Sequence, residues 1–330
     1  MKNKLYVDFH IIQTVPPSCV NRDDTNSPKT AVYGGVRRAR VSSQAWKKAV
    51  RDEFITKGVR TKNIVDIVAE KLGGDSALAE KIITAASIKI KDGKSGALFF
   101  ISDRQAVSLA CLAADGNFNK QAAQIALNEN PTIDIALFGR MVADDPNLNI
   151  DAACQVAHAI STHKADTEFD FFTAIDDRSP DDNAGAGMMG TIEFNSSTLY
   201  RYATIAAHDL KVQLGSAEQT AAAVREFADA FIRSMPTGKQ NTFANRTLPD
   251  YVLITVREDQ PVNLVGAFEK PVRGADGFAE QSIERLGEFA QKLYAEYSGA
   301  PKAAYIVSRD TPLPALLNTL QEEIQNDLTD

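Results

Sequence analysis

Cysteine is scarce in this chain, and long apolar runs are missing from it. The 330 residues hold three cysteines, Cys19, Cys111 and Cys154, with no CxxC spacing among them. Scattered thiols of this kind are typical of a reducing compartment, and they argue against a disulfide-stapled domain. The densest apolar segment, residues 97–101, is far shorter than the ~18 residues of a membrane span. Polar residues also interrupt the N-terminal stretch that would form a signal peptide, so we expect a cytoplasmic protein with no membrane partner.

Signatures of catalysis are missing as well. The sequence contains no HExxH, GxxxxGK[ST], GxSxG or GxGxxG pattern. His158 and His163 are five residues apart, a spacing that does not align two metal ligands on one helix face. Asp23 and Asp24 are the best-placed neighbouring carboxylates for a metal-dependent nuclease, but adjacent acids do not usually point at one metal ion. We therefore expect no catalytic residue, no metal and no cofactor.

The charge of the chain is unevenly distributed. The net charge of −7 argues by itself against a nucleic-acid-binding protein. Residues 25–51, however, carry seven basic residues and no acidic one, which leaves −14 for the rest of the chain. The seven are Lys29, Arg37, Arg38, Arg40, Lys47, Lys48 and Arg51. A local basic cluster on an acidic body can hold phosphate groups while the body discourages indiscriminate binding.

Part of this cluster lies on a predicted helix, residues 43–57, which Ser42 or Ser43 can cap. At ~100° per residue, its apolar face is formed by Trp46, Ala49, Val50 and Phe54, and Gln44, Lys47, Lys48 and Arg51 share another sector. The alternative is an ordinary solvated helix face. Arginine forks and lysine charges suit phosphates, with Ser42, Ser43 and Gln44 as neutral donors. Contacts of this type position a nucleic-acid backbone and carry no sequence information.

The order of the predicted elements indicates the fold class. A strand at residues 5–11 should end at Pro16-Pro17, and helical patterns fill residues 58–132, with a capping box at Ser102 and Gln105. Further strands are expected at residues 133–137, 168–176, 191–205 and 251–257, and further helices at residues 151–161, 217–235 and 281–297. Without the helical insertion, the order is strand, helix, strand, strand, helix, strand. This order predicts an α+β, ferredoxin-like (RRM-like) βαββαβ fold, although that superfold hosts many functions.

A Gly-rich polar segment at residues 177–190 separates two of these strands and is interpreted as a protruding hairpin. Met188 and Met189 are expected at its tip, where they could insert between stacked bases. Met141, beside Arg140, could do the same. A methionine is more often a core residue, and this reading stays open for all three.

Several segments, in order along the chain, resemble the CasC family. They are residues 18–24 (SCVNRDD), 33–35 (YGG), 37–44 (RRARVSSQ), 134–141 (DIALFGRM), 158–163 (HAISTH) and 170–177 (DFFTAIDD), with further matches at residues 193–203, 238–240 and 263–270. The family supplies the backbone subunit of the type I-E CRISPR Cascade complex. The resemblance covers residues 5 to about 290.

The resemblance implies a subunit shaped like a right hand, several copies of which polymerise head to tail along one CRISPR RNA and kink it at regular intervals. The guide bases between kinks pair with target DNA, and the other partners are CasA, CasB, CasD and CasE. It divides the chain into a palm (1–57), helical fingers (58–132), a return segment (133–174), a thumb hairpin (175–191) and the second part of the palm (192–330). Some relatives cleave RNA from a similar first loop, which leaves a metal-dependent RNase acting through Asp23 or Asp24 as the alternative.

The resemblance also assigns roles to single residues. It implies RNA-backbone contacts for Arg22, Lys29, Ser42, Gln44, Lys47 and Arg51, and it places Met141 and Thr173 near the kinked nucleotides. Together with the cluster described above, the predicted RNA-binding residues are Arg22, Lys29, Arg37, Arg38, Arg40, Ser42, Ser43, Gln44, Lys47, Lys48, Arg51, Met141 and Thr173. Met188 and Met189 are the predicted base-displacing residues of the thumb.

Overall fold

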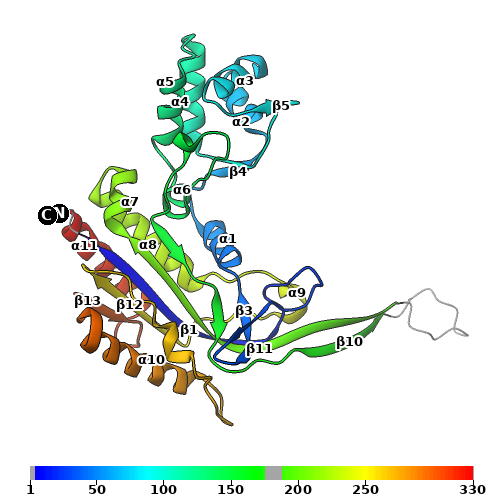
Figure 1. The fold of residues 1–330 in the computed structure, drawn as a ribbon, viewed down its shortest axis with the longest axis vertical. Helices are drawn as coiled ribbons and strands as arrows, with labels where there is room; N and C mark the ends of the chain where they lie inside the picture. The colour runs from blue at the N-terminus through cyan, green and yellow to red at the C-terminus, as the bar shows by residue number, and fades with distance from the viewer. Residues whose placement is uncertain (1–3, 175–187, 330) are drawn as a thin grey trace, which may run out of the picture.

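The computed structural model describes residues 4–174 and 188–329, and its fold is α+β. A large antiparallel sheet has the strand order β13-β12-β1-β11-β9-β3-β2, and β8 and β10 also pair with β11 (Figure 1). Its strands are β1 (Tyr6–Ser18), β2 (Thr30–Tyr33), β3 (Val36–Val41), β8 (Cys154–Val156), β9 (Ala159–Ser161), β10 (Glu168–Ala174), β11 (Met188–Ala206), β12 (Tyr251–Arg257) and β13 (Ala303–Ile306). The sheet is the platform on which the other elements are arranged.

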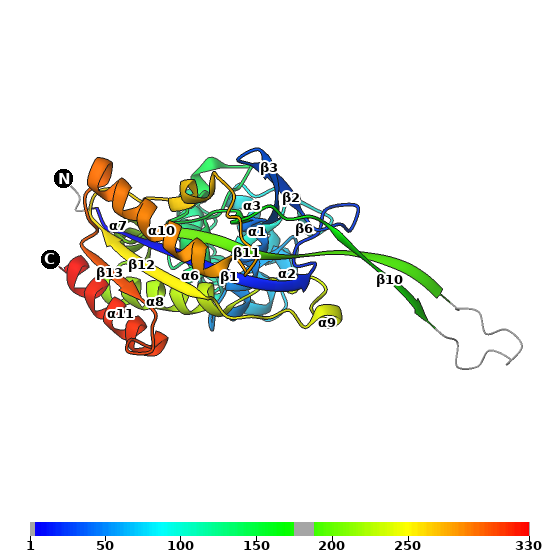
Figure 2. The same cartoon turned by 90° about the horizontal axis from the view of Figure 1, so that it is seen from below.

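Helices cover both faces of the central strands, so β1 is buried on both sides. One face, which includes Val7, Phe9 and Ile11, packs against α1, α7, α8 and α11. The other face, which includes Ile12 and Tyr200, packs against η2 and α10 (Figure 2). The bounds are α1 (Ser43–Glu53), α7 (Ala207–Leu214), α8 (Ala217–Arg233), α11 (Leu313–Thr329), η2 (Leu264–Phe268), α10 (Ala279–Leu293) and η3 (Tyr294–Ser298).

The expectation that Pro16-Pro17 ends the first strand is wrong. Strand β1 continues to Ser18, which pairs with Asn195 of β11. The register shifts between Val15 and Ser18. A bulge absorbs the two prolines, which have no N–H to donate to the ladder.

Residues 59–148 contain a second hydrophobic core, which forms a lobe that stands apart from the sheet (Figure 1). Its buried members run from Ile64 to Leu148. Its elements are β4 (Val59–Thr61), α2 (Ile64–Lys71), α3 (Ser76–Ala85), β5 (Ile90–Lys91), β6 (Lys94–Ser95), β7 (Phe99–Ile101), α4 (Asp103–Ala114), α5 (Lys120–Asn128) and η1 (Pro146–Leu148). The predicted capping box at Ser102 and Gln105 is confirmed at the start of α4.

Two predicted elements between the lobe and the sheet are wrong. Residues 133–137 belong to helix α6 (Ile133–Phe138) rather than a strand, and the helix is buried on most sides, so its alternating apolar residues carry no strand signal. Residues 151–161 contain β8 and β9 rather than a helix. These two strands cover the free edge of the long strand β11, and this pairing overrides the helical preference of their alanines.

Strands β10 and β11 extend beyond the sheet as a two-stranded arm (Figure 2). The pairing runs from Glu168 opposite Phe194 to Ala174 opposite Met188. Met188 and Met189 therefore lie on a strand of the arm and not at the tip of a loop, which corrects the sequence prediction. Most of the predicted thumb, residues 175–187, lies outside the described residues.

Candidate nucleic-acid interface

Helix α1 is fixed to the sheet by its apolar face. Trp46 is 1% exposed, and the guanidinium carbon of Arg201 lies 3.8 Å from the centre of its ring system. Arg201 is itself buried and donates hydrogen bonds to Gln13 and to the carbonyl of Phe231, and burial lowers its pKa to about 9. This anchoring turns Gln44 and Lys48 to solvent and leaves Lys47 half-buried.

The loop at residues 21–29 and the β2–β3 hairpin are tied to the start of α1. The backbone N–H of Ser42 donates to Oδ1 of Asn21 at 2.9 Å, and the N–H of Lys29 donates to the Asn21 carbonyl at 2.8 Å. The backbone N–H of Arg40 donates to the Lys29 carbonyl at 2.9 Å. In the described structure the first turn of α1 has no acidic residue and Ser42 forms no side-chain cap. This helix end can therefore favour an anion.

Asp23 organises the first loop from within. Its Oδ1 accepts hydrogen bonds from the Thr25 hydroxyl at 2.7 Å, the Thr25 N–H at 2.9 Å and the Ser27 N–H at 3.0 Å. These bonds, the Thr25 hydroxyl foremost, lower the pKa of Asp23. Asp24 is exposed. Within residues 4–174 and 188–329, no three His, Cys, Asp or Glu side chains come together as metal ligands would.

The basic residues differ in how far their charges are already engaged. Arg22 and Arg37 are exposed, and Lys29 and Lys47 are half-buried. Lys48 forms a surface pair with Asp52 at 2.5 Å, which is a weak interaction that a phosphate can replace.

Arg40 lies against a histidine at the same surface. Its Nη1 is 3.0 Å from Nδ1 of His158. Burial, followed by the charges of Arg40 and Lys29, lowers the pKa of His158, so its ring is neutral and accepts from Arg40. The Arg40 Nε donates to the Thr30 carbonyl, which holds the side chain along the hairpin.

Arg38 does not fit the predicted RNA-binding role, because its side chain is fully buried. Its guanidinium donates to the carbonyls of Tyr33, Ser161 and Phe268 at 3.0, 3.0 and 2.8 Å. Successive residues of a strand face opposite sides, so Arg37 is exposed and Arg38 points inward. Arg38 clamps β3 to the C-terminal end of η2.

Arg51 is also engaged within the protein. Its Nε donates to Oδ2 of the buried Asp134 at 2.8 Å, and Nη2 donates to the Gly58 carbonyl at 3.0 Å. The guanidinium carbon lies 4.6 Å from the centre of the Phe100 ring. Arg51 therefore joins α1 to the lobe, and about a fifth of its side chain remains exposed.

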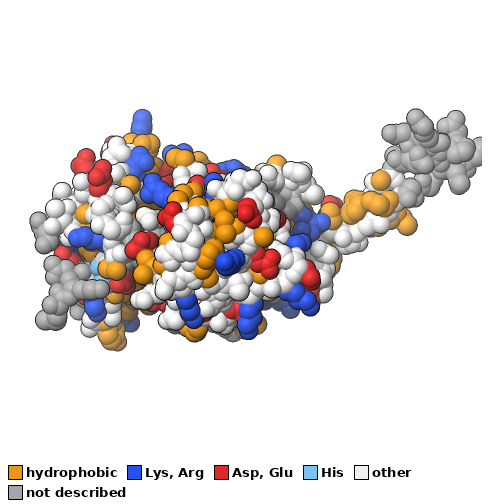
Figure 3. Space-filling view, turned by 90° about the horizontal axis from the view of Figure 1, so that it is seen from above, with side chains coloured by type: hydrophobic (Ala, Val, Ile, Leu, Met, Phe, Trp, Pro, Cys, Tyr) orange, Lys and Arg blue, Asp and Glu red, His pale blue; other side chains and the backbone are white. Residues whose placement is uncertain are grey.

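The remaining predicted residues lie on other elements. Met141 is 85% exposed on the segment that returns from the lobe to the sheet. Thr173 is exposed on β10 and pairs with Met189 of β11. Met188 and Met189 are exposed with Phe169 and Phe171, and Figure 3 shows this apolar group on the arm, with Lys and Arg side chains where the arm meets the body.

Sequence reasoning missed one basic residue near the first loop. Gly238 packs so tightly that a Cβ would lie 2.2 Å from the Val20 carbonyl oxygen. This approach brings Lys239, at φ +47°, to the base of the loop just before α9 (Gln240–Phe243). In the sequence, the glycine directly before Lys239 was the feature that could have indicated a close backbone approach at this position.

Comparisons with known proteins find matches that cover nearly the whole chain. The family model described as CT1975-like protein matches residues 7–329. A chain of a "CRISPR RNA-guided surveillance complex, pre-nicking" has 34% sequence identity and a TM-score of 0.84, with 97% of this chain and 100% of that chain covered. A chain of a "CRISPR RNA-guided surveillance complex" has 32% identity and a TM-score of 0.65, with 98% and 99% covered. No curated protein matches the chain. The described helices include none long and apolar enough to cross a membrane.

Proposed function

The chain belongs to the CT1975-like protein family, and from this membership we propose that it is a CRISPR RNA-binding subunit of a Cascade-type surveillance complex. The similar solved chains are components of CRISPR RNA-guided surveillance complexes and are covered almost completely by this chain. The proposal assigns the same kind of complex to this chain, whose own surface carries basic residues that can contact RNA phosphates.

The observation that carries the proposal is the joined surface of the first loop, the β2–β3 hairpin and α1. The Asn21–Ser42 and Lys29–Asn21 hydrogen bonds hold the three elements as one unit. Exposed or half-buried basic residues and an uncapped helix N-terminus lie along it. Such a surface suits a phosphate backbone and reads no bases, so sequence would be read by the guide itself through base pairing with target DNA.

We further propose that copies of the chain polymerise head to tail along the guide as the CasC-type backbone of a type I-E complex, with CasA, CasB, CasD and CasE as partners. Contacts that do not close on themselves generate a helical filament, and the guide length would limit the number of copies. The arm of β10 and β11 reaches away from the body, as a thumb that crosses to a neighbour requires (Figure 2).

The ferredoxin-like palm stays part of this proposal. In the sheet, β1 lies between β12 and β11, and β8 and β9 pair with the other edge of β11. Along the chain, α8 lies between β11 and β12. Both arrangements are consistent with a βαββαβ core. The chain would act in the cytoplasm as a non-catalytic subunit. The three hydrogen bonds that Asp23 accepts within its loop support a structural role for this carboxylate over the RNase alternative.

Purification with and without RNase tests the proposal. Expression with a CRISPR array should give large assemblies with a high 260/280 nm absorbance ratio that RNase dissolves. A nucleic-acid-free monomer would contradict it. Cleavage of a complementary RNA at regular intervals with Mg²⁺, abolished by Asp23→Ala or Asp24→Ala, would instead establish the alternative.

A further inference from the structure

The two histidines of the segment HAISTH, residues 158–163, lie in different surroundings. His163 is buried, and both of its ring nitrogens form hydrogen bonds with backbone groups. His158, between β8 and β9, is exposed. The other two histidines of the chain, His10 and His208, are buried and half-buried. His158 is therefore the one histidine that a ligand can contact directly at the surface.

Arg40 decides which ring nitrogen of His158 carries the proton. A guanidinium group has donors only, so Nδ1 of His158, 3.0 Å from Nη1 of Arg40, must be the acceptor. The neutral ring then carries its proton on Nε2. Arg40 itself is fixed, because its Nε donates to the Thr30 carbonyl and its backbone N–H donates to the Lys29 carbonyl, both at 2.9 Å. The two side chains thus form a pair whose geometry is set before any ligand binds.

Within the described residues, the charged groups that act on His158 are positive. Burial first, and then the charges of Arg40 on β3 and Lys29 in the first loop, lower the pKa of His158. Residues 154–161, which include β8 and β9, contain no other charged residue. On the α1 side the charge that acts on β8 is that of Lys47, and Arg201 of β11 is buried. Surroundings of this kind keep the ring neutral and favour an anion beside it.

A phosphate group at this pair would change the protonation of the ring. Nη1 of Arg40 and Nδ1 of His158 are close enough for one phosphate oxygen to accept from both, provided that Nδ1 carries a proton. Hydrogen bonds between ionised partners are about twice as strong as neutral ones. The negative charge of the phosphate also offsets the charges of Arg40 and Lys29, which otherwise oppose protonation.

We propose that Arg40 and His158 form one phosphate-binding site on the RNA-binding surface, and that His158 takes up a proton from solvent when an RNA backbone phosphate occupies this site. Arg40 keeps its Nε on the Thr30 carbonyl and turns Nη1 from the ring to the phosphate. This assignment rests on the proposed function, because the RNA must lie along the first loop and β3. Since the complex binds more protons than the free protein, RNA affinity should rise as the pH falls from 7.5 to 6.

Isothermal titration calorimetry measures this proton directly. The purified chain is titrated with a short single-stranded RNA at pH 6.5 in MES and in ACES, two phosphate-free buffers with different enthalpies of ionisation. The change of the binding enthalpy with the buffer gives the number of protons that each copy takes up. We expect a positive uptake of up to one proton for the wild type. The affinity should rise about fivefold from pH 7.5 to 6, because one proton changes affinity by at most tenfold per pH unit.

Two variants separate the proton from the contact. His158→Gln keeps an acceptor for Arg40 at an exposed position, and it should abolish both the uptake and the pH dependence. His158→Lys carries a permanent charge, so it should bind RNA at pH 7.5 about as tightly as the wild type does at pH 6, without taking up a proton.

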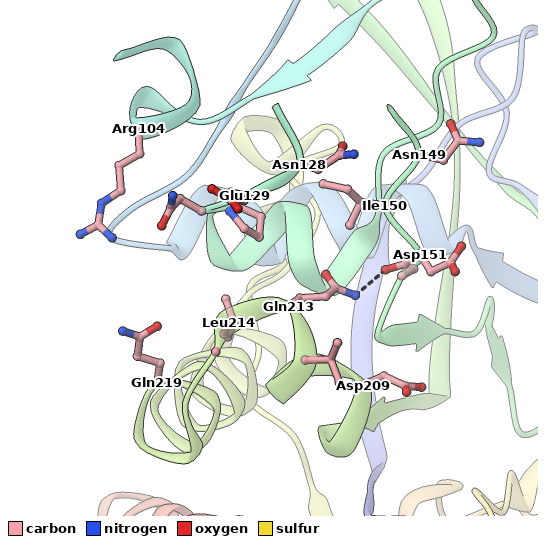
Figure 4. Close-up of a pocket in the computed structure, with 15 residues that line it drawn as sticks. Arg104, Asn128, Glu129, Asn149, Ile150, Asp151, Asp209, Gln213, Leu214 and Gln219 are labelled. Carbon is pink, nitrogen blue, oxygen red and sulfur yellow. Dashed lines mark hydrogen bonds between the residues drawn. The ribbon is translucent and has the colours of Figure 1, made fainter. Parts of the chain in front are cut away.

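The matched control is His208→Gln, which should keep the uptake of the wild type. His208 lies beside Leu5, at the opposite end of β1 from the first loop. Its Nε2 is 3.6 Å from Oδ2 of Asp209, which lines a separate cleft of about 730 Å³ next to the lobe (Figure 4).

Two outcomes would overturn the assignment and leave the proposed function standing. One is RNA binding by the wild type without proton uptake, and the other is an equal uptake by the wild type and His158→Gln. A wild-type protein that binds no RNA at any pH would instead contradict the proposed function itself.

Discussion

Arg51 of helix α1 donates a 2.8 Å hydrogen bond from Nε to Oδ2 of Asp134, a fully buried carboxylate at the start of α6. Oδ1 of Asp134 accepts from the Gly58 N–H and the Thr132 hydroxyl. A residue of the predicted RNA-binding face therefore also fastens the lobe to the sheet domain. Reversing its charge would place two carboxylates together, so a loss of RNA binding in such a variant could not be assigned to the surface alone.

Arg51→Ala should lower the free energy of unfolding by about 3 kcal/mol, because it leaves a buried carboxylate without its ionic partner. Denaturation by urea measures this loss. Lys48→Ala, on the same helix, should change stability by less than ~0.5 kcal/mol, since its partner Asp52 is exposed. Equal stabilities of the two variants would contradict the structural role of Arg51.

Arg38→Ala should lower the stability of the protein, whereas Arg37→Ala should weaken its RNA binding. The first leaves three carbonyls without their donor and should cost about 3 kcal/mol or more in unfolding free energy. Arg38→Lys should not restore the loss, because one ammonium cannot reach all three acceptors. Arg37→Ala should leave the stability within ~0.5 kcal/mol and weaken RNA binding. A stable Arg38→Ala protein would disprove the clamp between β3 and the C-terminal end of η2.

Lys47→Ala tests the phosphate contact at a half-buried position, where Nζ of Lys47 lies 5.5 Å from the ring centre of Phe138. Loss of one phosphate contact to a single strand should reduce the slope of log affinity against log salt concentration by about 0.7. Affinities of the assembled subunit for RNA at several salt concentrations measure this slope. Lys292→Ala, an exposed lysine on α10 away from the basic face, is the matched control and should leave the slope unchanged. An unchanged slope for Lys47→Ala would remove it from the interface.

The pH dependence of stability should reveal two buried groups that act in opposite directions. Burial raises the pKa of Asp8 to about 6, against partial compensation from its hydrogen bonds. Burial, with a smaller effect of Arg257, lowers the pKa of His10 to about 3. From pH 4 to 6 the folded state holds the Asp8 proton that the unfolded state has lost, so the Asp8 contribution to stability falls as the pH rises. The His10 contribution rises from pH 3 to 6.5, because only the unfolded state binds that proton.

Asp8→Asn removes the first contribution and keeps the second. The stability of this variant relative to the wild type should therefore increase by about 2 kcal/mol between pH 4 and pH 7. Urea unfolding at a series of pH values measures the change, and Asp24→Asn, at an exposed position, is the control for the removal of a carboxylate. A constant difference between Asp8→Asn and wild type would show that Asp8 has an ordinary pKa in the fold.

Much of the fold could be predicted from local pattern. The strands around residues 168–174 and 251–257, the helix at 217–233 and the capping box at Ser102 all carry clear periodicity or capping chemistry, and the structure confirms them. The errors fall where tertiary contacts decide. Residues 154–156 and 159–161 form strands because β11 offers an unpaired edge, and residues 133–138 form a helix whose Ala136 and Leu137 pack into the core of the sheet domain.

Only part of the candidate site could be predicted from the sequence. Sequence located the basic residues, but it could not tell which of them are exposed. Strand alternation shows only that Arg37 and Arg38 face opposite sides of β3. Which of the two side chains is buried depends on the segment at Phe268, which is distant in the sequence and packs against one side. Nor could sequence show that strands β4 and β7 place Arg60 across from Phe100.

A series of RNA lengths tests the central proposal most directly. The purified chain is mixed with single-stranded RNAs that lengthen in small steps, and the mass of each complex is measured. The account predicts that the number of 35.9 kDa copies rises stepwise, one copy for each fixed number of added nucleotides, and that RNase reverses the assembly. A protein that stays monomeric on RNAs of every length would contradict it.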